Sequence, residues 1–66
     1  MDSSIIKFRT IQFINGIGYL YENQVEDLCY LMCHYLGIEK CEENFIIVRE
    51  ACKTYFDLQN SLEYVK

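Results

Sequence analysis

A regular apolar pattern in the last third of the chain limits its possible folds most strongly. Six apolar residues are separated by steps of 3, 4, 3, 4 and 3, the heptad seam of a helix that packs against a neighbour. They are Val48, Ala51, Tyr55, Leu58, Leu62 and Val65. The pattern predicts a long helix over residues 42–65, which occupies more than a third of the 66-residue chain.

A second helix is predicted over residues 23–36. Asn23 suits the N-cap position, Glu26 follows at the spacing of a capping box, and Gly37 suits the position just beyond the C-terminus. The apolar residues form two adjacent stripes, so we expect this helix to be covered on nearly all sides. One stripe is Val25, Cys29, Met32 and Leu36, and the next is Leu28, Leu31 and Tyr35. The short connection to the long helix predicts that the two are antiparallel neighbours.

The N-terminal third of the chain allows two interpretations. Residues 5–14 are rich in β-branched and aromatic types and lead into Asn15-Gly16, which is typical of a type I′ turn. This pattern predicts a β-hairpin over residues 5–22. The alternative is a first helix over about residues 4–14 that ends at the same Asn-Gly pair.

These elements together predict an α+β fold in a single small domain, residues 1–66, with an N-terminal β-hairpin followed by two antiparallel helices. The alternative is an all-α three-helix bundle. A chain of this length buries only about 60% of the surface of its unfolded form, so its core is marginal. The long seam is also wider than the shorter helix can cover. Its excess, at Leu58, Leu62 and Val65, is expected either to cover the hairpin or to form the contact of a homodimer.

A candidate interaction surface follows from the hairpin register. A two-residue turn places Ile11, Phe13 and Leu20 on the sheet face that points away from the helices. Clustered exposed apolar side chains of this kind mark interaction sites. The predicted interaction residues are therefore Ile11, Phe13, Leu20, Leu58, Leu62 and Val65.

The charge of the chain favours a protein partner. Ten acidic residues against six basic ones give a net charge of −4, whereas nucleic-acid binding needs a basic stripe. An acidic surface suits a basic patch on another protein. No apolar run is long enough to span a membrane, and Asp2 stands where an export signal needs positive charge. We therefore expect a cytoplasmic protein.

The four cysteines are interpreted as buried thiols, and no cofactor is predicted. Cys29 and Cys33 lie one helical turn apart, and antiparallel helices would place Cys52 level with the first and Cys41 near the second. All four could then converge on a metal ion, and they are the expected ligands if a metal is bound. A free cysteine, however, usually behaves as a small buried apolar residue, and no CxxC motif is present. Disulfides are the third interpretation, and they require an oxidising compartment.

No catalytic motif is recognisable, so the chain is predicted not to be an enzyme. It has neither a glycine-rich phosphate loop nor a GxSxG motif. His34 is the only histidine, and its neighbour Cys33 points about 100° away around the helix, which excludes a nucleophile–base pair.

The predicted function is a small intracellular protein-protein interaction module, a regulator or inhibitor of another protein. Ile, Lys, Asn, Tyr and Phe supply 26 of 66 residues, the bias of AT-rich coding DNA, which suggests a phage or viral origin and a location in the host cytoplasm. One alternative is an acidic nucleic-acid mimic or DNA-related regulator, which requires Glu26, Glu39, Glu42 and Glu43 on one exposed face. A small metal-bound structural module is the other.

Overall fold

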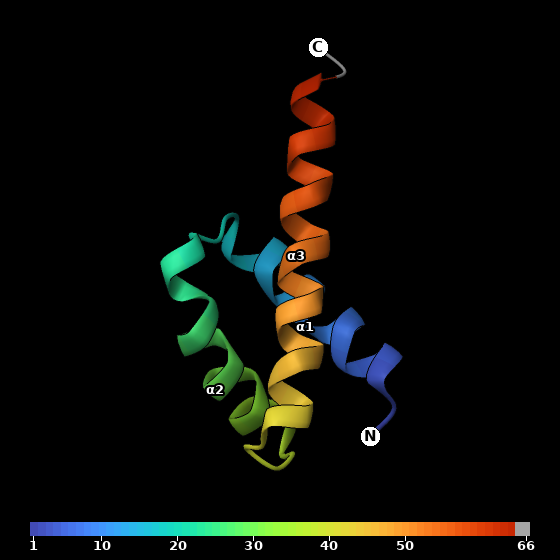
Figure 1. Cartoon of the computed structure of the whole chain (residues 1–66), viewed down its shortest axis with the longest axis vertical. Helices are drawn as coiled ribbons and strands as arrows, with labels where there is room; N and C mark the ends of the chain where they lie inside the picture. Colours follow the sequence, from blue (N-terminus) through green and yellow to red (C-terminus); the bar gives the residue numbers. More distant parts are fainter. Residues whose placement is uncertain (65–66) are drawn as a thin grey trace.

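The computed structural model describes the backbone of residues 1–64 and the side chains of residues 1–60, and every regular element in this part of the chain is helical. Three α-helices follow one another, with a short 3₁₀ turn before the second (Figure 1). They are α1 (Ser3–Ile17), η1 (Glu22–Gln24), α2 (Val25–Leu36) and α3 (Glu42–Tyr64). The predicted α+β fold with an N-terminal β-hairpin is therefore wrong, and the alternative of three helices describes the chain.

α1 forms in place of the hairpin because a helix satisfies its own backbone and buries one face here. Its start is fixed by Asp2, whose carboxylate accepts a hydrogen bond of 2.8 Å from the Ser4 backbone N–H. Ile6, Thr10 and Ile14, spaced by four residues, are all buried. The Thr10 hydroxyl donates to the Ile6 carbonyl oxygen at 2.7 Å, so this buried polar group is satisfied within its own helix.

The end of α1 lies beyond the predicted turn. Asn15 and Gly16 belong to the helix, which stops at Gly18. Gly18 has a φ of 94°, and its N–H donates to the Ile14 carbonyl oxygen at 3.0 Å, the αL form of a helix end. Gly16 lacks the positive φ that a type I′ turn requires.

The prediction of α2 is confirmed at its C-terminus and corrected at its start. Gly37 has a φ of 69°, and the Ile38 N–H donates to the Cys33 carbonyl oxygen at 3.0 Å, as in a Schellman motif. Asn23 is not the N-cap, because it lies within η1. There the side-chain oxygen of Gln24 accepts a hydrogen bond of 3.1 Å from the backbone N–H of Tyr21. The short connection after Gly37 turns the chain back into α3, which runs antiparallel to α2 (Figure 1).

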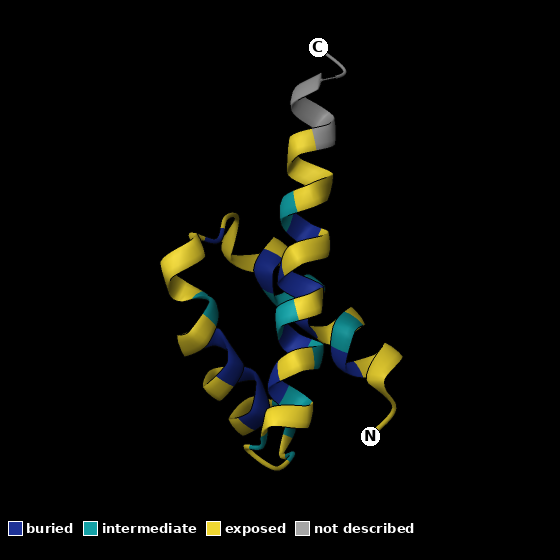
Figure 2. Ribbon diagram, in the orientation of Figure 1, coloured by how far each residue is buried: buried dark blue, intermediate teal, exposed yellow. Residues whose placement is uncertain are grey.

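The core forms where α3 meets the two other helices. Val48, Ala51 and Tyr55 of the predicted seam are buried. α1 and α2 both pack on α3 and make few close backbone contacts with each other. Figure 2 shows the buried residues gathered on the faces turned toward this junction. The long helix thus has α1 as its second neighbour, although Leu58, part of the predicted excess of the seam, stays exposed.

Ion pairs tie both outer helices to α3. Lys7 of α1 lies 2.9 Å from Glu50. Arg49 donates from Nε and Nη2 to the two carboxylate oxygens of Glu26 on α2, at 3.0 Å each, and from Nη1 to Glu42 at 2.7 Å. The hydrogen bonds from Arg49 lower the pKa of Glu26. These exposed pairs fix orientation more than they add stability.

The last turns of α3 project past the other helices, so that the molecule measures 40 × 22 × 20 Å (Figure 1). With 23 residues α3 is the longest element. It carries a charged face, and none of the helices in residues 1–64 combines the length and the apolar character that crossing a bilayer requires.

Candidate functional site

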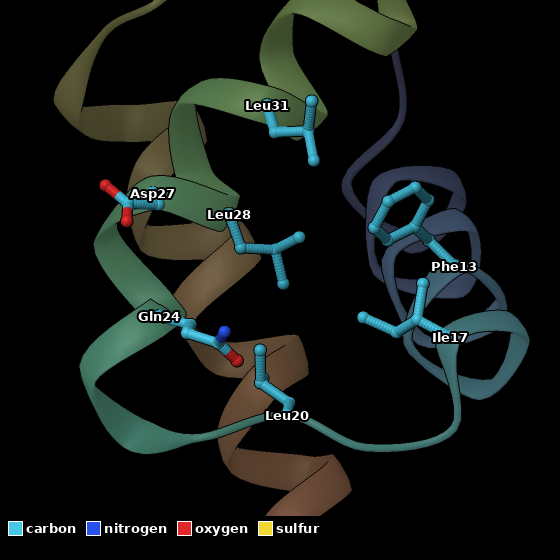
Figure 3. A pocket seen from close by; sticks show the side chains of 7 residues that line it. All are labelled: Phe13, Ile17, Leu20, Gln24, Asp27, Leu28 and Leu31. Carbon is cyan, nitrogen blue, oxygen red and sulfur yellow. The ribbon is translucent and has the colours of Figure 1, made fainter.

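An apolar groove lies between α1 and α2, which diverge from each other while both pack on α3. Its main hollow has a volume of about 260 Å³. The lining residues are Phe13, Ile17, Leu20, Gln24, Asp27, Leu28 and Leu31. Figure 3 shows Phe13 and Ile17 directed from α1 toward Leu28 and Leu31 on α2, with Leu20 between the helices at one end. We call this feature the interhelix groove.

A second hollow extends the groove toward the start of α1. It has a volume of about 200 Å³ and is lined by Arg9, Gln12, Phe13 and Tyr35. The ring of Phe13 lines both hollows and lies 6.2 Å from the ring of Tyr35, measured between centroids. From Arg9 to Ile17 the groove follows α1 for about 12 Å at 1.5 Å per residue, the length of two to three turns of a docked helix.

The groove exposes apolar surface that the fold does not use. Ile17 is 51% exposed, Leu31 46% and Tyr35 66%. The expectation that α2 is covered on nearly all sides is therefore wrong for its second stripe, of which only Leu28 is buried. Adjacent exposed apolar side chains around a hollow are the usual mark of an interaction surface.

The structure brings together two of the three residues predicted on the hairpin face. Phe13 is half-buried and Leu20 is buried, and both line the groove. Ile11 is half-buried and lines neither hollow. The open sheet face that was to carry all three does not exist, because residues 1–64 contain no strand.

The predicted dimer contact at the end of α3 is only partly described. Leu58 is 55% exposed and lies apart from both hollows. The side chain of Leu62 and the whole of Val65 lie outside the described parts of the chain. The exposure of Leu58 agrees with the expectation that the seam is longer than its neighbours can cover.

Ile17, Leu28 and Leu31 line the groove and were not predicted as binding residues. A signal for two of them was present in the sequence, because Leu28 and Leu31 form the second apolar stripe of α2. Ile17 gave no such signal, since it was assigned to a strand. The sequence could not indicate that α1 and α2 diverge, and this divergence leaves the stripe open.

The cysteines lie mainly in the core. Cys29, Cys33 and Cys52 are buried, Cys41 is half-buried, and all four are free thiols. The Cys29 thiol makes a weak hydrogen bond of 3.7 Å to the carbonyl oxygen of Phe45. Among the described residues, no three His, Cys, Asp or Glu side chains are grouped so that they could hold a metal ion.

Burial makes these thiols weak acids. It raises the pKa of Cys29 and Cys33, and it raises the pKa of Cys52 to about 11. The negative charge of a neighbouring thiolate raises two of these pKa values further. Cys29 raises the pKa of Cys52, and Cys41 raises the pKa of Cys33. These neighbours are the pairs that antiparallel helices predicted. The buried thiols are therefore protonated and poor nucleophiles at neutral pH.

The acidic residues proposed as a nucleic-acid mimic are not equivalent in the structure. Glu26 and Glu42 both pair with Arg49. Glu39 and Glu43 are exposed. Half of the proposed acidic row is thus neutralised by a neighbouring guanidinium.

No protein-family model, curated protein or solved structure matches the chain.

Proposed function

We propose that the chain is a protein-interaction module that binds an amphipathic helix of another protein in the interhelix groove. The observation that supports it is the apolar lining between two helices that pack on a third helix and make few contacts with each other. A helix in this position would contact α1 and α2 at once and complete a four-helix arrangement. Axes of packed helices lie about 8–10 Å apart, so the occupant would hold the two flanking helices at an ordinary packing distance.

The chemistry of the lining suits binding better than catalysis. Five of the seven residues around the main hollow are apolar, and the polar ones are Gln24 and Asp27. An apolar centre with a polar rim is the usual layout of a protein interface. A helix enters such a groove through apolar anchors spaced by about one turn, at positions i, i+4 and i+7.

The contact is small, and this sets the expected affinity. Two to three turns of helix bury less surface than a stable complex of two folded proteins. The complex is therefore transient, with a Kd on the order of micromolar. A regulator or an inhibitor that must release its target works in this range.

The nucleic-acid mimic and the homodimer have weaker support. The nucleic-acid mimic needs a row of free carboxylates, and Arg49 occupies two of the four. The predicted homodimer remains a separate proposal, because Leu58 lies outside the groove. A second copy in the groove is one outcome that the experiment must distinguish.

The test uses one groove residue and a matched control. Leu31 and Ile46 are both 46% exposed, and Ile46 lines neither hollow. Amphipathic helical peptides are selected from a display library against the wild-type protein, and their affinities are then measured for Leu31→Asp and Ile46→Asp. Circular dichroism checks that both variants keep their helix content.

We expect Leu31→Asp to weaken peptide binding at least about tenfold, because a carboxylate would replace a buried apolar contact. Ile46→Asp should bind as the wild type does. Equal binding to both variants, or a library that yields no helical peptide, would contradict the proposed function. Sedimentation of the wild type and of Leu31→Asp identifies the case in which a second copy fills the groove, because only a dimer formed through the groove should be lost in the variant.

A further inference from the structure

The two ends of the interhelix groove carry opposite charges. Arg9 lines the smaller hollow beside Tyr35, and Asp27 lines the main hollow. In Figure 3 the Asp27 carboxylate stands at the outer edge of α2, directed away from the base of the hollow. Asp27 therefore belongs to the rim on the side of α2, and Arg9, which is also exposed, belongs to the rim of the smaller hollow.

Apart from the place of Asp27 in the acidic first turn of α2, the fold makes little use of these two rim charges. Among the side chains of residues 1–60, Arg9 and Asp27 have no ion-pair partner. Lys7 and Arg49, in contrast, each pair with acidic residues and tie their helices together. The two rim charges remain available to a bound molecule.

The dipoles of the flanking helices do not favour either direction of a bound helix. At one end of the groove Ile17, the last residue of α1, lies beside the start of α2 at Gln24 and Leu28. At the other end Arg9, in the first half of α1, lies beside Tyr35 near the end of α2. The two helices therefore run in opposite directions along the groove. Their dipoles, each equivalent to about half a charge at either end, act in opposite senses on an occupant. The rim charges then decide its direction.

We propose that the groove binds its helix in a single direction, with an acidic first turn beside Arg9 and a basic last turn beside Asp27. This inference rests on the proposed function. Helices commonly carry acidic residues in the first turn and basic residues in the last, and these full charges outweigh the half charges of the helix dipole. The partner is thus an amphipathic helix of ordinary charge pattern that runs parallel to α1 and antiparallel to α2.

Two synthetic peptides of about three turns test the direction. They share one apolar stripe, taken from the selected peptides, and differ only in that the acidic and basic residues at their ends are exchanged. Each carries a nitroxide label at its N-terminus, which broadens the amide signals of nearby residues in the protein. Affinities are measured for the wild type and for the double variant Arg9→Glu with Asp27→Lys.

For the wild type we expect the peptide with the acidic first turn to bind about tenfold more tightly, because two exposed ion pairs replace two repulsions. Its label should broaden amides near Arg9 more strongly than those near Asp27, because the broadening falls steeply with distance from the nitroxide. The double variant should reverse the preference, and 1 M salt should remove it in both proteins. The control exchanges Glu39 and Lys40, which line neither hollow, and should change nothing.

Two results separate this inference from the function on which it rests. If both peptides bind equally and the label broadens the two ends of the groove to the same extent, the single direction is wrong while the groove remains a binding site. The same holds if the double variant leaves the preference unchanged. If neither peptide binds although both are helical, the proposed function itself fails.

Discussion

Replacement of Gly16 by alanine is expected to stabilise the protein, whereas the same replacement at Gly18 is expected to destabilise it. Gly16 is inside α1, and a Cβ atom built there meets no other atom within 4 Å. Alanine is about 0.5–1 kcal/mol more favourable than glycine at a helical position, because glycine loses more conformational entropy on folding. Gly18 has a φ of 94°, where an L side chain is strained. Alanine there costs about 1–2 kcal/mol.

Thermal unfolding followed by circular dichroism measures both effects. In a domain of this size 1 kcal/mol corresponds to about 4–8 °C in Tm. The Tm should therefore rise by about 2–8 °C for Gly16→Ala and fall by about 4–16 °C for Gly18→Ala. Destabilisation by Gly16→Ala would refute the reasoning, because it would indicate the positive φ of an Asn15-Gly16 hairpin turn. An unchanged Tm for Gly18→Ala would show that α1 does not end there.

Three further predictions concern the core and its thiols. Met32 is buried, so Met32→Ala should lower the free energy of unfolding by about 2–5 kcal/mol, most of the stability of such a small domain. Leu31 is exposed, and Leu31→Ala should lower it by under about 1 kcal/mol. Equal effects of the two substitutions would mean that the buried face of α2 is misassigned. One thiol, Cys41, should react with a thiol reagent in the native protein and the other three only after unfolding, and four fast thiols would contradict this. Because burial raises the pKa of Cys52 to about 11, the folded state holds a proton that the unfolded state has lost above its ordinary thiol pKa. Stability should therefore fall as the pH rises from about 9 to 11, less steeply in Cys52→Ala, and an identical pH profile for the two proteins would exclude this cause.

The second half of the fold could be predicted because its signals are local. Gly37 ends α2 in the left-handed conformation, which favours glycine and can be expected from the sequence just beyond a helical pattern. The seam of α3 repeats often enough to identify a helix without knowledge of what it packs against.

The prediction of a hairpin in the first half of the fold was wrong because tertiary packing overrode the local preference for strands. β-Branched and aromatic residues fill residues 5–14, and their preference for strands is weaker than the gain from burying one face on α3. That face was hard to recognise, because its centre is Thr10, a polar residue whose hydroxyl is satisfied by the carbonyl oxygen of Ile6. The Asn15-Gly16 pair then suggested a turn two residues before the helix ends at Gly18.

The candidate site depends on the angle between two helices, which no local pattern specifies. Phe13 and Leu20 were singled out as large apolar residues, and both line the groove, although on a helix and its connection rather than on a sheet. Leu31 was expected to be covered, since a stripe on a helix does not indicate whether a neighbour exists. The charges at Arg9 and Asp27 acquire a common role only when the groove between them is known.

The separation of α1 from α2 has a thermodynamic consequence. Since the two helices share α3 but hardly touch each other, substitutions on their facing sides, such as Ile17→Ala and Leu31→Ala, should have additive effects on the free protein. A helix bound between them contacts both side chains, so the same pair of substitutions should become coupled by about 0.5–3 kcal/mol. Coupling of this kind is reciprocal, so the bound helix would also make the local opening of α1 depend on α2. In the free protein α1 and α2 would open independently, and with the helix bound they would open as one cooperative unit. Amide hydrogen exchange, measured residue by residue, distinguishes the two cases.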